Sequence, residues 1–263
     1  MSAVTRFLDS LTGCNKSERT GEPVDWGSLR RTEPVSRQFG FDRGTPIDRY
    51  YIEQFLTERA NDIRGAVLEI GDATYTRRFG GKRVARSDVL HATADNRRAT
   101  LVGDLASGRG IPDSAYDCII LTQTLLCIYD VKSAVANACR ALKPGGVVLA
   151  TVPGISQISR YDMDRWGDFW RFTSRSARRL FADVLGDENV EVASYGNVLA
   201  ATAFLHGLSA EELNREELGQ PDPDYEVTIA VRAVRSACVP DARNPSASYD
   251  LLFSQTNDIP ATD

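Results

Sequence analysis

The sequence has few of the residues that build metal sites and disulfides. Its 263 residues include two histidines, His91 and His206, and five cysteines. No two cysteines form a C-x-x-C pair, so we expect no metal site. Cys118 lies inside an apolar run, which is typical of a buried thiol in a reducing compartment.

Long hydrophobic runs and an excess of positive charge are also missing. No apolar run approaches the roughly 20 residues of a membrane span, and residues 1–10 lack the apolar core of a secretory signal. The net charge is −5, whereas a nucleic-acid-binding domain presents a broad basic surface. We therefore expect a cytoplasmic protein with neither a nucleic acid nor a membrane as partner.

Glycine is also scarce in the turn after the first predicted strand, where a ligand would bind. The turn after the first predicted strand, residues 71–76, contains glycine only at Gly71. The Gly-x-Gly-x-x-Gly pattern of dinucleotide-binding proteins is absent there, which argues against an NAD-dependent dehydrogenase. Ala73 and Thr74 also limit how closely the backbone can approach a ligand.

What remains is the composition of an ordinary globular protein, 42% hydrophobic and 25% charged. We divide the chain into three parts. Residues 1–60 form an N-terminal arm and a helix that covers the ligand site, with Thr45 capping the helix and Pro46 at its first position. Residues 61–236 form the main domain. Residues 237–263, rich in Pro, Ser, Asn and Asp, form an irregular or disordered tail.

Strand and helix patterns alternate along the main domain. This alternation predicts an α/β fold: a Rossmann-like, mostly parallel seven-stranded sheet with helices on both faces and an antiparallel last strand. Helices are expected over residues 131–142, 174–185 and 198–208, the second capped by Thr173 or Ser174. The expected strands are residues 66–71, 83–86, 99–102, 116–122, 147–152, 189–195 and 225–234.

Carboxylates follow the first three predicted strands. In an open parallel sheet the ligand lies outside the carboxyl ends of the strands. Asp88 after the second strand suits a ribose diol, and Asp104 after the third suits an exocyclic amine. Turns also favour Asp at strand ends for purely structural reasons. Glu69, inside an apolar strand, needs either backbone amides or a ligand as its partner.

Residues 66–153 resemble the class I methyltransferases that use S-adenosyl-L-methionine, and in particular the methyltransferase type 11-like group. The flanking residues 39–51 and 166–173 resemble a bacterial subgroup found with glycosyltransferases and in biosynthetic clusters. The resemblance depends on Val67-Leu68-Glu69-Ile70-Gly71, on Asp88, on Gly103-Asp104-Leu105, on residues 111–119, and on Leu142-Lys143-Pro144-Gly145-Gly146.

This resemblance implies S-adenosyl-L-methionine as cofactor and a role for each matched residue. Glu69, Gly71 and Asp72 would shape the turn beside its methionine part, and Asp88 would bind the ribose. Asp104 and Leu105 would meet the adenine, and Thr122 and Gln123 would face the sulfonium and the substrate. From the N-terminal arm, Arg43 is a candidate for the cofactor carboxylate, or else a surface ion-pair partner, and Tyr51 is a candidate cover.

The remaining candidates lie in the second half of the chain. An aromatic loop after the fifth strand supplies candidate substrate-binding residues: Tyr161, Trp166, Trp170 and Arg171. The candidate general bases are His206, Asp162 and Asp164, with His91 as a further histidine. His206 lies on an apolar stretch, where a structural histidine is the more common case.

Two functional hypotheses follow. The first is methyl transfer to an oxygen or nitrogen of a small molecule or glycan, such as a sugar or natural-product intermediate, with a homodimer left open. Methyl transfer requires mainly alignment of the reactants, so a conspicuous catalytic motif is not expected. The second is a protein with the methyltransferase fold that transfers no methyl group, because fold alone does not determine function.

Overall fold

The computed structural model describes residues 25–237. The chain divides into two compact units at the bond between Glu33 and Pro34. In the first unit the described part contains one 3-10 turn, Gly27–Leu29. Residues 1–24 of the predicted N-terminal part and residues 238–263 of the predicted tail lie outside the described residues, as do Cys14 and Cys238.

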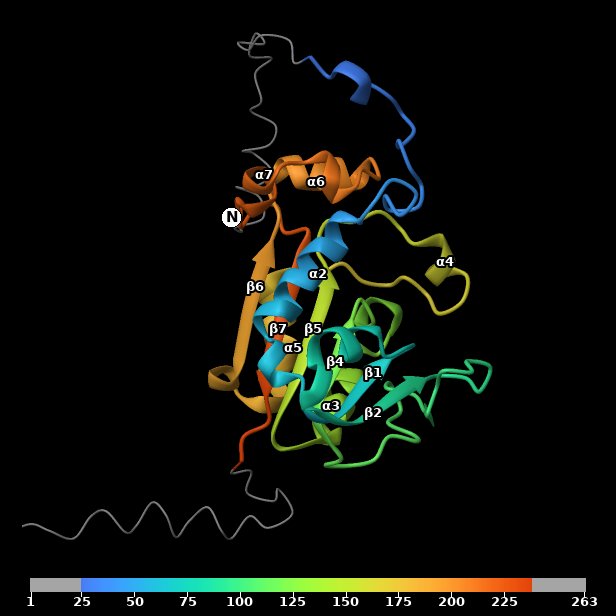
Figure 1. Ribbon diagram of the computed structural model, residues 1–263, viewed down its shortest axis with the longest axis vertical. Coiled ribbons are helices and arrows are strands. Elements are labelled where there is room, and N and C mark those ends of the chain that lie inside the picture. Colours follow the sequence, from blue (N-terminus) through green and yellow to red (C-terminus); the bar gives the residue numbers. More distant parts are fainter. Residues whose placement is uncertain (1–24, 238–263) are drawn as a thin grey trace, which may run out of the picture. The chain divides into compact units, whose positions relative to one another are not determined.

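The second unit is built on a seven-stranded sheet of order β3-β2-β1-β4-β5-β7-β6 (Figure 1). All neighbours pair in parallel except at β7, which is antiparallel to both β5 and β6. The predicted Rossmann-like fold with an antiparallel last strand is confirmed. The strands are β1 Gly65–Ile70, β2 Val84–His91, β3 Leu101–Val102, β4 Tyr116–Thr122, β5 Leu142–Pro153, β6 Val190–Tyr195 and β7 Thr228–Val234.

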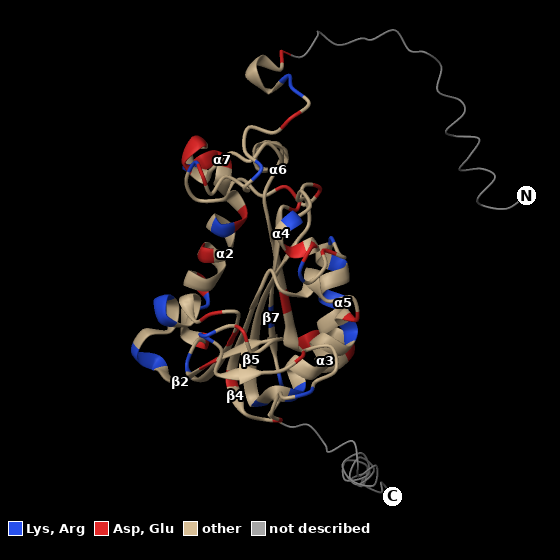
Figure 2. Cartoon of the chain, turned by 90° about the vertical axis from the view of Figure 1, so that its right-hand side faces the viewer, with Lys and Arg blue, Asp and Glu red and all other residues tan. Residues whose placement is uncertain are grey.

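Helices cover both faces of the sheet (Figure 2). Alternate strand residues point to opposite faces. Leu68 and Ile119 pack with α3 (Val131–Ala141) and α5 (Ser174–Leu185), whereas Val67 and Cys118 pack with α2 (Ile47–Glu58). A third apolar cluster joins α2 to α6 (Val198–Leu205) and α7 (Arg215–Gly219). No helix among the described residues is both long and apolar enough to cross a bilayer.

Side-chain caps begin several helices. Asp130 accepts from the Ser133 amide at 3.2 Å to start α3, and Thr173 forms a capping box with Ser176 to start α5, as expected. The predicted Thr45 cap of α2 is wrong. The Thr45 hydroxyl instead donates to Glu211 at 2.7 Å, and α2 begins after Pro46 without a side-chain cap.

Two connections differ from the prediction in ways that matter for the site. The second strand runs through to His91, well beyond the predicted residue 86. The link from β1 to β2 contains a short π-helical turn, Thr76–Gly80, and a 3-10 turn, Gly81–Arg83. After β5 the chain makes one short helix, α4 (Arg160–Met163), within the predicted aromatic loop.

Candidate active site

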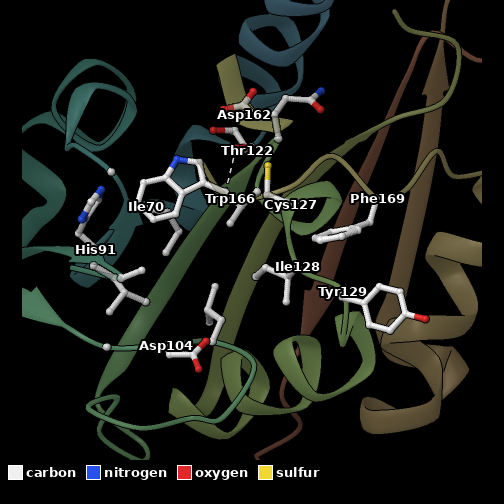
Figure 3. A pocket seen from close by; sticks show the side chains of 17 residues that line it. Ile70, His91, Asp104, Thr122, Cys127, Ile128, Tyr129, Asp162, Trp166 and Phe169 are labelled. Atoms are coloured by element: carbon white, nitrogen blue, oxygen red, sulfur yellow. Dashed lines mark hydrogen bonds between the residues drawn. The ribbon is translucent and has the colours of Figure 1, made fainter. Parts of the chain in front are cut away.

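A cavity of about 500 Å³ opens at the carboxyl ends of the parallel strands (Figure 3). This volume lies within the range of roughly 300–1,000 Å³ typical of small-molecule sites. Its lining comes from the ends of β1, β2 and β4, the residues after β3, and the loops after β4 and β5. The lining residues used below are Ile70, Gly71, His91, Asp104, Leu105, Thr122, Gln123, Cys127, Asp162, Trp166 and Phe169.

The charge of this cavity is one-sided. None of its 17 lining residues is Lys or Arg, and Asp104 and Asp162 contribute carboxylates. Burial raises the pKa of the Cys127 thiol to about 12, so that side chain stays neutral. Such a lining favours a cation over an anion.

The turn after β1 is held by a buried carboxylate. Glu69 is 3% exposed and accepts from the amides of Tyr75 at 3.1 Å and Thr76 at 2.7 Å. Burial raises the pKa of Glu69, against these hydrogen bonds. Gly71 has a φ of +81°, which favours glycine, and it lines the cavity. Of the two partners expected for Glu69, the structure shows the backbone amides, and the side chain does not line the cavity.

Asp72 also serves the turn. Its carboxylate accepts from the Thr74 amide at 2.8 Å and lies 3.5 Å from Arg98. It does not line the cavity, whereas neighbouring Gly71 does.

The prediction that Asp88 follows the second strand is wrong. Asp88 lies within β2, where it accepts from the Tyr116 hydroxyl at 3.1 Å and pairs with Arg86 at 3.2 Å. Burial raises the pKa of Tyr116 to about 12, which keeps that hydroxyl a donor. The residue that actually ends β2 at the cavity is His91, whose Nδ1 contacts Thr93.

The residues after β3 lie where the sequence predicts. Asp104 and Leu105 both line the cavity, and Leu105 is 5% exposed. Asp104 accepts from the Ser107 hydroxyl at 2.7 Å and from the Ala106 amide at 2.9 Å. The Ser107 hydrogen bond lowers the pKa of Asp104, so its carboxylate is charged at neutral pH.

Trp166 reaches across the cavity from the loop after β5. Its indole meets the His91 ring edge to face, with ring centroids 5.4 Å apart (Figure 3). Its amide donates to the Asp162 carbonyl at 2.7 Å, which ties the two lining residues together. This contact joins the β5 loop to the end of β2.

A second, smaller cavity of about 180 Å³ shares Thr122, Gln123 and Asp162 with the first. Its volume is well below the usual size of a drug-sized site, so it suits a small molecule. Besides these shared residues, the lining includes Phe39, Phe41, Asp48, Arg49, Tyr75, Ser156, Gln157, Asp168, Arg171 and Phe204. The two cavities thus lie next to each other at the end of β4, where they share these lining residues.

Gln123 is held in an unusual state at this junction. Its φ is +46°, a conformation that non-glycine residues rarely adopt outside strained or functional positions. Its Nε2 is buried and has no hydrogen-bond partner among the described residues. An unsatisfied buried donor is costly, so the site offers a ligand a ready hydrogen bond.

The first turn of α2 supplies charges that sequence reasoning missed. Arg49 lies between two rings, 5.3 Å from the Phe41 centroid and 5.7 Å from the Tyr75 centroid, and its Nε is buried without a partner among the described residues. Asp48 accepts from the Arg49 amide at 2.7 Å, and burial raises the pKa of its carboxyl. Only the predicted helix start at Pro46, beside the ligand end of the sheet, hinted at these two residues.

Arg171 and Asp168 form the other charged pair of the second cavity. Arg171 Nη2 donates to Asp168 at 3.0 Å and also to the Gln157 carbonyl at 2.6 Å. Asp168 also accepts from the Ser159 amide at 2.9 Å. Arg171 therefore lines a cavity as predicted, but its charge is already paired.

Besides Glu69, Asp72 and Asp88, six further predicted site residues lie outside both cavities. Arg43 is paired with Glu212, and the Tyr51 hydroxyl donates to the Leu218 carbonyl at 3.0 Å. Tyr161 is 66% exposed beneath Arg165, and Asp164 is also exposed. Trp170 donates to the Ile128 carbonyl at 3.0 Å. His206 ends α6 with its carbonyl accepting from Val35 and Ser36.

Comparison with known proteins gives one family match. Residues 72–150 match the protein family described as "Methyltransferase domain". Residues 72–150 are therefore similar to a methyltransferase domain, and S-adenosyl-L-methionine is the cofactor that this similarity implies. A search of curated proteins returns no match.

The solved structures reported next are remote from this chain in sequence. A SAM-dependent methyltransferase from Archaeoglobus fulgidus is 12% identical over 71% of this chain and 94% of its own, with a TM-score of 0.47. The N-methyltransferase NodS from Bradyrhizobium japonicum, solved with S-adenosyl-L-homocysteine, is 13% identical over 77% and 94%, with a TM-score of 0.46. The cyclase SpnF is 16% identical over 89% and 93%, with a TM-score of 0.48.

Proposed function

We propose that this protein transfers the methyl group of S-adenosyl-L-methionine to an oxygen or nitrogen of a small molecule, such as a sugar or natural-product intermediate. The observation that carries the proposal is that two neighbouring cavities share Thr122, Gln123 and Asp162 as lining residues. A two-substrate transfer needs such a junction, since the reacting atoms must be held in line.

The first cavity suits the cofactor. Gly71 would accommodate the methionine part and His91 the ribose, while Asp104 and Leu105 would face the adenine. The cavity contains no lysine or arginine to repel a sulfonium, and Asp162 and Gln123 lie on its acceptor side. When bound, the cofactor supplies an electrophilic methyl group, and the protein contributes alignment and exclusion of water.

Trp166 and Arg171 are proposed to contact the substrate or to close the site over it, from the loop after β5. Of the three predicted general bases, His206, Asp162 and Asp164, Asp162 is the one that lines both cavities. A cytoplasmic location stays a prediction, which cell fractionation would test.

The second hypothesis, a methyltransferase fold without methyl transfer, is favoured by two features of the site. The turn after β1 has a single glycine, and a histidine ends β2 where a ribose-binding carboxylate was expected. Both features alter the part of the cavity that would hold the cofactor.

Calorimetric titration of the full chain with S-adenosyl-L-homocysteine separates the two hypotheses. Methyl transfer requires saturable binding of one ligand per chain, competed by S-adenosyl-L-methionine. A folded protein that binds neither compound would overturn the proposal and leave the second hypothesis.

A further inference from the structure

We propose that the second cavity takes a small amine as the methyl acceptor, and that Asp48 accepts the proton that its nitrogen must lose. This inference depends on the proposed function, because it names the substrate class of that same site. The charges and the unpaired hydrogen-bonding groups of the cavity wall support this inference.

The wall holds more negative than positive charge. Three carboxylates, those of Asp48, Asp162 and Asp168, face two guanidiniums, those of Arg49 and Arg171. Arg171 is bound to Asp168. Within residues 25–237 Asp48, Asp162 and Arg49 form no ion pair at 4 Å or less, and the charge of Arg49 acts to lower the pKa of Asp48, against the effect of burial. The cavity therefore has two carboxylates to offer to a ligand and favours a cationic or hydrogen-rich group such as an amine.

The hydrogen-bond donors of the cavity wall indicate which other groups the ligand carries. Arg49 Nε and Gln123 Nε2 are both buried and lack partners among the described residues. Each can donate to a hydroxyl, ether or carbonyl oxygen. An amine that also carries such oxygens, an amino alcohol or amino sugar, satisfies both kinds of group within about 180 Å³.

Proton transfer follows from the same arrangement. An ammonium has no lone pair and cannot attack, so the bound R–NH3⁺ first gives one proton to the Asp48 carboxylate. The nitrogen lone pair then forms a bond to the methyl carbon as the carbon–sulfur bond breaks, and that bond's electron pair stays on sulfur. Asp48 afterwards returns its proton to solvent. Burial raises the pKa of Asp48, which makes its carboxylate a better proton acceptor than an exposed one.

The test measures binding of matched probes to the full chain saturated with S-adenosyl-L-homocysteine, by ligand-observed NMR. The probes are ethanolamine and glucosamine, with ethylene glycol and glucose as their hydroxyl counterparts. We expect both amines to bind about tenfold or more tightly than their counterparts. Asp48→Asn should weaken amine binding by about tenfold, which is the effect of losing one charge-assisted hydrogen bond. The affinity for S-adenosyl-L-homocysteine should stay unchanged.

The control is Glu58→Gln, which removes the same charge from an exposed position of the same helix and should change nothing. Asp162→Asn, in the loop after β5, provides a second variant if Asp48→Asn does not fold, and should weaken amine binding similarly. Equal binding of amines and hydroxyl counterparts, or amine binding that neither variant weakens, overturns the inference. A protein that fails to bind S-adenosyl-L-homocysteine instead overturns the proposed function, so the two failures are distinct.

Discussion

At the scale of single residues, the sequence prediction and the structure disagree most on which residue lies at the proposed ribose position. Asp88 has the expected chemistry, but it lies inside β2 and is held by Tyr116 and Arg86. His91 has the expected place, at the end of the strand and on the cavity wall. An imidazole nitrogen can accept from one ribose hydroxyl, where a carboxylate accepts from two.

We therefore predict opposite effects for two substitutions. His91→Ala should weaken binding of S-adenosyl-L-homocysteine by about tenfold, because a hydrogen bond and a ring contact are lost. Asp88→Asn should leave that affinity within about twofold and lower the free energy of unfolding by about 1 kcal/mol, because it weakens the hydrogen bond from Tyr116. Calorimetry and urea unfolding measure the two effects. An affinity loss confined to Asp88→Asn would reverse this assignment.

Trp166 provides an intrinsic fluorescence probe of the first cavity. It lines the cavity and touches His91, whereas Trp170 does not line it. Binding of S-adenosyl-L-homocysteine should therefore change the intrinsic fluorescence through Trp166. The signal should disappear in Trp166→Phe and persist in Trp170→Phe. A change that survives Trp166→Phe would place the ligand elsewhere.

At the scale of secondary-structure elements, buried strands were the most predictable. The predicted strand 116–122 has the bounds of β4, because its centre, residues 118–121, is an apolar run of the kind that a strand buried on both faces needs. The end of β2 was not predictable in the same way. The middle of β2, which contains Arg86, Ser87 and Asp88, is polar and lies toward solvent. The apolar pattern that predicts a strand is therefore interrupted there, although the strand continues to His91.

The turn between β1 and β2 gives a prediction about folding stability. Glu69→Gln replaces one acceptor oxygen by an amide donor facing the backbone amides of Tyr75 and Thr76. Leaving a buried amide unsatisfied costs about 1–3 kcal/mol, so we expect a loss of that size in urea unfolding. Glu58→Gln, on the exposed end of α2, is the matched control and should change stability little. Equal stability of both variants would mean that Glu69 does not hold the turn.

At the scale of the second unit, the contacts that position the site join segments far apart in the sequence. Pro46 forms an isolated bridge with Ser209, and Thr45 bonds to Glu211 across a separation of 166 residues. Local patterns carry no information about such pairs. This is why Arg43 and Tyr51 were predicted as ligand contacts, and why the second cavity, built from α2 together with the β5 loop, was missed.

The contribution of one such contact, the Arg43–Glu212 ion pair, can be tested through the pH dependence of folding stability. Hydrogen bonds from Arg43 lower the pKa of Glu212 from 4.5 to about 2. The folded protein therefore binds this proton more weakly than the unfolded chain. The stability from the pair is present above about pH 4.5 and is lost as the pH falls toward 2. Because the two side chains are 36% and 31% exposed, solvent screening limits the contribution to about 1 kcal/mol.

Glu212→Gln should therefore lower the free energy of unfolding by about 1 kcal/mol at neutral pH and by almost nothing near pH 2. Urea unfolding at a series of pH values, with wild type and variant compared at each, isolates this carboxylate from others with lowered pKa, such as Asp168 and Asp187. Asp164→Asn, on an exposed side chain, should follow the wild-type curve throughout. A difference between Glu212→Gln and wild type that does not shrink below pH 4.5 would show that this pair contributes no pH-dependent stability. In that case packing around Ser209, and not charge, would hold residues 40–46 against the end of α6.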